Sequence, residues 1–260
     1  MSKRTQLFTV VAASAALILT FALPAASDDG PDLRTYRVTL VNLTDGQPFS
    51  PPVAATHRRG IHMFQVGGFA SNQLAAIAQG GDQGPMFQLF NGAPGVTQAV
   101  DIGAPLTRTG KVADPPGPPG PFVDSATFQI TARAGDRLSL ATMLICTNDG
   151  FLGLDSVRLP SHGARAFLIN GYDAGRENNT QLSQDLVDPC TDLGPVPLPG
   201  DPDGNFDTGA VLTNPPTRIQ HHPNIQAGVG ELTPAAHGWR DPVAVAVVSR
   251  IDGGGEDEDD

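Results

Sequence analysis

The sequence of 260 residues has little charge and none of the common catalytic motifs. Only 17% of its residues are charged. It has no GxSxG nucleophile motif, no HExxH zinc motif and no glycine-rich phosphate loop between a strand and a helix. The adjacent His221 and His222 would point to opposite faces of a strand, so they make a poor chelating pair. We therefore expect a protein that is not an enzyme and holds no zinc.

Long apolar runs and an excess of positive charge are also missing. After the first 27 residues no stretch is long and apolar enough to span a bilayer. The formal net charge of −11 at pH 7 argues against nucleic acid and against anionic membrane surfaces as partners. What the chain does have is 30 glycines and 24 prolines, a composition that favours short strands joined by many turns.

The amino terminus has the pattern of a secretory signal peptide. Lys3 and Arg4 form a short basic region, an apolar run covers 7–23, and small residues then allow cleavage after Ala26 or Ser27. An uncleaved membrane anchor is the alternative, because the run approaches the length of a spanning helix. We expect residues 1–27 to be removed and the protein to be secreted, periplasmic or extracellular, with no stable membrane insertion after cleavage.

The rest of the chain suits one large β domain rather than two small ones. We assign residues 28–252 to this domain. Residues 253–260 are predicted to be a disordered acidic tail, because a glycine spacer precedes five acidic residues.

Hydrophobic patterning predicts strands and one short helix. Strands are predicted at 36–43, 128–132, 138–145, 167–170 and 243–248, a short strand or extended piece at 62–66, and a stiff proline-rich loop at 114–121. Near-continuous Val and Ala in the last strand predict a central strand that is covered on both faces. The helix is predicted at 71–78, with Ser71 as its N-cap and Gly80–Gly81 as its end.

Two cysteines, Cys146 and Cys190, are the only ones in the chain. Because export would expose them to an oxidising compartment, we expect a disulfide between them. The alternative is a pair of unpaired buried thiols.

Acidic residues follow two apolar runs. One run ends at Ile145 and is followed by Asp149, and another ends at Tyr172 and is followed by Asp173 and Glu177. If both strands belong to one sandwich, the loops beyond them can converge and form an oxygen-rich pocket suited to calcium. The alternative is that these residues only form turns. A further stretch at 201–207 has an incomplete calcium-loop pattern, and a plain Asx-turn explains it better than an accessory calcium contact.

Several segments resemble one known family. They include YRVTLVNLTDGQPFSPPVAATH at 36–57, TNDGF at 147–151, YDAGRENN at 172–179 and VAVAVVSRI at 243–251. Together they are similar to the amino-terminal domain of the spondin family, in the form found in secreted bacterial proteins related to F-spondin. The resemblance implies an antiparallel β-sandwich similar to C-two-type calcium domains, with one bound calcium and no catalytic activity.

The calcium carboxylates of that family fall on Asp149, Asp173 and Glu177 in this sequence. The third is a departure, because the animal domain has Asp where this chain has Glu177, which is one methylene longer and can chelate bidentately.

The expected function is that of a secreted calcium-binding sandwich acting as an adhesion or interaction module, whose partner is an unknown extracellular protein or glycan. The alternative is a secreted hydrolase or carbohydrate-binding protein that uses the acidic loop cleft, with Asp149, Asp155 and Asp173 as its carboxylates. Trp239 and Arg240 are candidate ligand contacts, since an exposed Trp beside Arg can stack on a sugar or a side chain. Trp239 could equally fill the core.

Overall fold

The computed structural model describes residues 32–113, 121–198 and 212–251. Four predicted features lie wholly or mostly outside the described residues: the signal peptide at 1–27, the proline-rich loop at 114–121, the acidic stretch at 201–207 and the tail at 253–260. None of the helices in the described part of the chain has the length and apolar character needed to cross a membrane.

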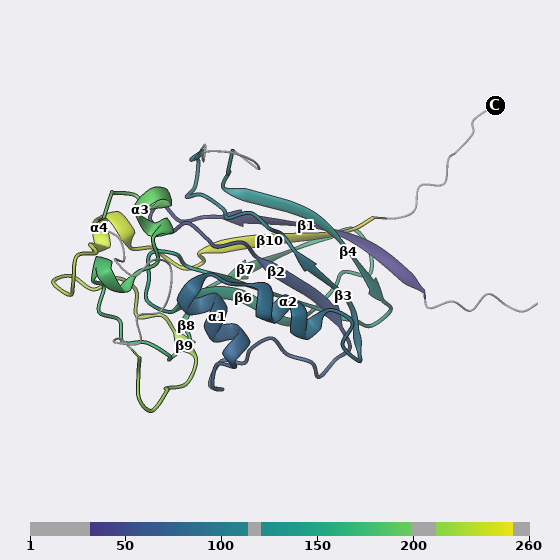
Figure 1. Ribbon diagram of the computed structural model, residues 1–260. Coiled ribbons are helices and arrows are strands. Elements are labelled where there is room, and N and C mark those ends of the chain that lie inside the picture. The colour runs from purple at the N-terminus through teal and green to yellow at the C-terminus, as the bar shows by residue number, and fades with distance from the viewer. Residues whose placement is uncertain (1–31, 114–120, 199–211, 252–260) are drawn as a thin grey trace, which may run out of the picture. The chain divides into compact units, whose positions relative to one another are not determined.

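Two antiparallel sheets form a β-sandwich (Figure 1). In the four-stranded sheet the order is β4 (Ser125–Arg133), β1 (Leu33–Asn42), β10 (Ala244–Ile251) and β7 (Ala164–Ile169). In the six-stranded sheet the order is β3 (Val96–Asp101), β2 (Val53–His57), β5 (Arg137–Met143), β6 (Gly150–Arg158), β8 (Gly171–Asp173) and β9 (Gln220–His221). The expected all-β sandwich is confirmed.

Alternate residues of facing strands fill the space between the sheets. On β1 the side chains of Tyr36, Val38 and Leu40 are buried, and on β5 those of Leu138 and Leu140 are buried in the same cluster. Side chains alternate between the two faces of a strand, so the predicted pattern at 36–43 corresponds to the inner face of β1. Each fully buried aliphatic side chain stabilises the fold by about 1.5–3 kcal/mol.

A second core lies on the outer face of the six-stranded sheet, beneath two helices. Helix α1 (Asn72–Gly80) begins after Ser71, whose hydroxyl accepts a hydrogen bond from the Leu74 amide. It ends at Gly81, which adopts the left-handed conformation with φ 68°. Both caps satisfy backbone groups that a helix end leaves unpaired, and the predicted helix is confirmed. The helix α2 (Gly84–Phe90) follows, and the side chains packed on the sheet include Leu74, Ile77, Met86 and Phe90.

The expectation of a single short helix is wrong. Besides α1 and α2, the described residues form α3 (Pro189–Leu193), α4 (Pro234–His237) and the 3-10 turn η1 (Ser183–Asp185). Each is five residues or fewer, too short for the periodic apolar pattern that identifies a helix in a sequence.

Two strand predictions are also corrected. Residues 62–66 form no strand. Asp155 on β6 fixes this segment instead, because its carboxylate accepts hydrogen bonds from the Met63 and Phe64 amides at 2.8 and 3.4 Å. Strand β10 is interior in its sheet, as predicted, but only one of its faces is buried, since Val247 on the other face is 37% exposed.

Candidate metal site

Asp149 and Asp173 lie next to each other at one end of the six-stranded sheet. Strand β6 begins just after Asp149, and its first residue, Gly150, pairs with Asp173 of β8. The amide of Ala174 also donates to the Asp149 carbonyl oxygen at 3.1 Å. Antiparallel pairing of β6 with β8 therefore brings together two carboxylates that are 24 positions apart in the sequence.

The Asp149 carboxylate is buried, and only one of its oxygens has a partner. Its Oδ2 accepts hydrogen bonds from the amides of Arg176 and Glu177 at 2.6 and 3.0 Å. Its Oδ1 is buried without a hydrogen-bond partner. Burial, and then the nearby Asp173 carboxylate, raise the pKa of Asp149 from 3.8 to about 7, although the two amides and Arg176 act in the opposite direction.

The Asp173 carboxylate shapes the loop that follows it. Its Oδ1 accepts a hydrogen bond from the Gly175 amide at 2.7 Å and its Oδ2 accepts one from the Asn179 side chain at 2.8 Å. Gly175 has φ 69°, and a Cβ at this position would lie 2.5 Å from the carbonyl oxygen of Thr217. Glycine is therefore required in the DAG sequence for the turn that carries residues 176 and 177 to Asp149.

Glu177 contacts Asp149 through its backbone. Its side chain is 5% exposed, and its Oε1 accepts a hydrogen bond from Gln79 of α1 at 2.9 Å. Among the residues that the structure describes, no group of three or more His, Cys, Asp or Glu side chains is arranged to hold a metal ion. The geometry thus places two of the three expected carboxylates together, and the third is directed to α1.

His222 is a half-buried polar group near Asp173. Its Nδ1 accepts a hydrogen bond from the Asn224 amide at 3.0 Å, so the neutral ring carries its proton on Nε2, which is buried without a partner. Burial lowers the pKa of His222 to about 4, against the opposing effects of Asp173 and Asp241. Its position became clear only from the fold, because the sequence shows just an adjacent pair of histidines.

Asp155 is not part of this cluster. Its Oδ2 lies 2.5 Å from Nδ1 of His62, and its other oxygen binds the amides described above. The structure therefore does not combine Asp155 with Asp149 and Asp173 in one acidic cleft.

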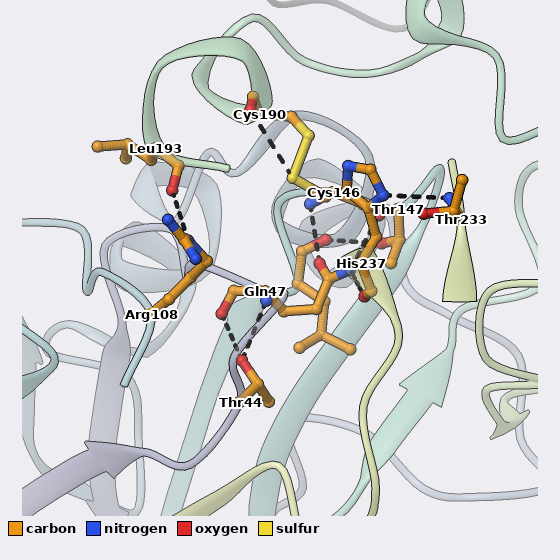
Figure 2. The surroundings of a disulfide bond; sticks show 10 residues. Thr44, Gln47, Arg108, Cys146, Thr147, Cys190, Leu193, Thr233 and His237 are labelled. Atoms are coloured by element: carbon orange, nitrogen blue, oxygen red, sulfur yellow. Dashed lines mark hydrogen bonds between the residues drawn. A yellow bond between two sulfur atoms is a disulfide. The ribbon is translucent and has the colours of Figure 1, made fainter. Parts of the chain in front are cut away.

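The expected disulfide is present and lies beside the site. Cys146, in the loop between β5 and β6, is bonded to Cys190 of α3, with Cα atoms 5.1 Å apart. Figure 2 shows that Gln47 reaches this loop from a distant part of the chain. Its Oε1 accepts from the Cys146 amide at 3.0 Å, and its Nε2 donates to the carbonyl oxygens of Cys146 and His237 at 3.2 and 2.7 Å. Sequence reasoning missed Gln47, because a lone glutamine in a loop carries no signal of such a role.

Trp239 and Arg240 contribute no carboxylate to the metal site and line a cavity of their own. They line a cavity of about 480 Å³ together with Asp45 and Asn224. Trp239 is partly buried and packs against both hydrophobic clusters, and its ring lies 5.1 Å from that of His222. Arg240 is exposed. Trp239 thus packs against the core and is half-buried.

No protein-family model matches this chain, and a search of curated proteins finds none that matches it.

Proposed function

We propose that this protein is a secreted, calcium-binding β-sandwich of the spondin type that acts as an adhesion or interaction module outside the cell. The observation that carries the proposal is the Asp149 carboxylate. It is fully buried beside Asp173, and its Oδ1 has no partner. A buried, unpaired carboxylate oxygen costs the fold free energy, which a cation at this point would offset.

The residues present fit a hard cation. Asp149 offers its free Oδ1, and each Asp173 oxygen accepts only one hydrogen bond from a described group, which leaves lone pairs for a metal. Carboxylate oxygens are the ligands that calcium prefers. Asp149 and Asp173 would hold the ion, and Glu177 is the third candidate donor. The bound ion would supply positive charge to two adjacent carboxylates and link the loops that carry them.

The disulfide supports an exported protein. Such bonds persist in oxidising compartments and are rare in the cytosol. The bridge ties α3 to the loop that precedes Asp149, and α3 follows the loop that begins at Asp173. Disulfide and metal would therefore restrain the same end of the sandwich, from which an interaction surface can be presented.

One observation favours the alternative, a secreted hydrolase or carbohydrate-binding protein. The pKa of about 7 for Asp149 is typical of a general acid that works near neutral pH. Burial opposes this reading, because the side chains of Asp149 and Asp173 are 0% and 3% exposed and a substrate could not reach them. A metal ligand, in contrast, is expected to be turned inward.

The proposal is tested by calcium titration calorimetry and by thermal unfolding with calcium or with excess chelator. We expect calcium to raise the melting temperature by mass action and Asp173→Asn to remove most of that rise. Asp101→Asn, at an exposed carboxylate that ends β3, is the matched control and should behave like the parent. Identical melting curves in calcium and in chelator would show that the proposed calcium site does not exist.

A further inference from the structure

Arginines gather at the end of the sandwich opposite Asp149 and Asp173. Strands β1 and β5 begin at this end, and β4, β6 and β10 finish there, whereas β8 lies at the other end (Figure 1). A cavity of about 280 Å³ opens here. Four arginines are among the residues that line it, one each from β1, β4, β5 and β6: Arg34, Arg133, Arg137 and Arg158.

The carboxylates at this end compensate only part of that charge. Asp136, which also lines the cavity, is 6% exposed, and its Oδ2 accepts hydrogen bonds from the Arg133 backbone amide at 2.9 Å and the Thr97 hydroxyl at 2.5 Å. Asp32 pairs with Arg34 at 2.7 Å. Within the described ranges, no carboxylate lies within 4.0 Å of the guanidinium groups of Arg133, Arg137 or Arg158.

Two features of the cluster are unfavourable for the fold alone. Arg137 and Arg158 are directly opposed in the register of β5 and β6, and like charges in such a pair destabilise a sheet. Arg34 continues the inner face of β1 that carries Tyr36, and its Nε is buried without a hydrogen-bond partner. The group as a whole is partly exposed and paired with Asp32, so this Nε–H is a donor that a bound anion would satisfy.

An anion with several oxygens would offset the positive charge around this cavity. A guanidinium group presents its N–H donors in a planar fork that matches sulfate, phosphate and carboxylate oxygens. Four arginines among the residues that line one small cavity favour a compact ligand of more than one negative charge or an anionic ester group. The overall charge of −11 repels anions in general, so binding at this end would depend on the local cluster.

We propose that the cavity lined by Arg34, Arg133, Arg137 and Arg158 is a binding site for a tetrahedral oxyanion group, a sulfate or phosphate ester. Further positive charge lies beside it, because Arg58 and Arg59 follow β2, whose last residue His57 pairs with Arg137. The site is separate from the proposed calcium site and does not depend on it.

The test uses four small ligands that share one sugar ring: glucose 6-sulfate, glucose 6-phosphate, glucuronate and glucose. Binding is followed by calorimetry and by amide chemical shifts in NMR, at low salt and with a chelator so that calcium cannot contribute. We expect at least one of the two esters to bind with a Kd on the order of 1 mM or tighter, glucuronate more weakly, and glucose not at all. The preferred ester identifies the group that the site accepts. Affinity should fall as salt is added.

Variants connect the binding to the cavity. Arg137→Gln/Arg158→Gln should raise the Kd at least tenfold, whereas Lys111→Gln removes one exposed charge elsewhere and should leave the Kd unchanged. Without ligand, the double variant should have a melting temperature equal to or higher than that of the parent, because two opposed like charges have been removed. If the two arginines had only a structural role, the melting temperature should fall instead. Arg158→Gln alone, at the exposed end of β6, should raise the Kd about threefold or more. Failure of both esters to bind, equal binding of glucose, or equal affinity in parent and double variant would overturn the proposal.

Discussion

The Asp149→Asn substitution should have opposite effects on stability in the absence and in the presence of calcium. In the fold without metal, the pKa of Asp149 is raised from 3.8 to about 7 by burial and by Asp173. An acid whose folded-state pKa lies above its unfolded value destabilises the fold as pH rises through that interval. At about 1.4 kcal/mol per pKa unit, the ionised Asp149 costs about 4 kcal/mol at pH 8.

Asparagine removes this cost and keeps an oxygen for the amides of Arg176 and Glu177. Its own amide group needs an acceptor where Oδ1 has none, so we expect a net gain of about 1–3 kcal/mol in chelator at pH 8. At about 2–4 °C per kcal/mol, the melting temperature should rise by about 2–12 °C. At pH 5 the cost falls to about 1.7 kcal/mol, because the carboxyl group is then protonated in the folded state but still ionised in the unfolded state. The cost of the asparagine amide group then cancels the gain or exceeds it.

With calcium the order should reverse. The parent should be stabilised by the ion and the variant should not, because it has lost one of two adjacent carboxylates. The assay is urea unfolding at pH 5 and pH 8, each with calcium and with chelator, and Asp101→Asn serves as the control at an exposed carboxylate. A variant that is less stable than the parent in chelator at pH 8 would refute the electrostatic argument. If calcium stabilised both proteins equally, Asp149 would not be a ligand of the ion.

Three further predictions concern the surroundings of this site. Cys146→Ala/Cys190→Ala should lower the free energy of unfolding by about 4 kcal/mol on chain-entropy grounds and weaken calcium binding; unchanged calcium affinity would show that the strands alone preform the site. Gln47→Leu removes three hydrogen bonds and leaves buried backbone groups unpaired, so urea unfolding should show a loss of about 2–4 kcal/mol, and a loss below 0.5 kcal/mol would contradict this role. The pKa of His222 is about 4 in the folded state and 6.5 in the unfolded state. In the Asp149→Asn variant, the free energy of unfolding should therefore fall by up to about 3 kcal/mol as pH drops from 6.5 to 4. Adding His222→Asn to that variant should make the free energy of unfolding nearly independent of pH over this range.

Local signals in the sequence were sufficient for some elements. The helix α1 was predictable because Ser71 and Gly81 cap it within the sequence itself. The disulfide followed from having only two cysteines in a chain for which export is expected. Strand β1 followed from strict alternation, since its inner face meets the core and its outer face does not.

Other elements left no such signal. Strand β6 contains Gly153 and carries few β-branched residues, so its sequence gives little strand signal. It is a strand because β5 and β8 pair with it on either side. Gly153 is needed there, since a Cβ would lie 2.4 Å from the carbonyl oxygen of Leu140. Similarly, Glu177 follows the expected DAG motif, but the hydrogen bond from Gln79 that directs its side chain comes from a helix 98 positions away.

Strand β6 connects the two charged ends of the molecule. It begins beside Asp149 and ends at Arg158, nine residues later, a length of about 30 Å at 3.3 Å per residue. Two carboxylates are adjacent at one end, and two arginines are directly opposed at the other. The charges of one pair cannot offset those of the other, because the separation is about four Debye lengths at physiological ionic strength. Each end therefore needs its own counter-charge, and sites so far apart, with no shared partners, contribute additively to stability. Calcium and the oxyanion are accordingly expected to bind independently, each compensating a like-charge pair of the fold.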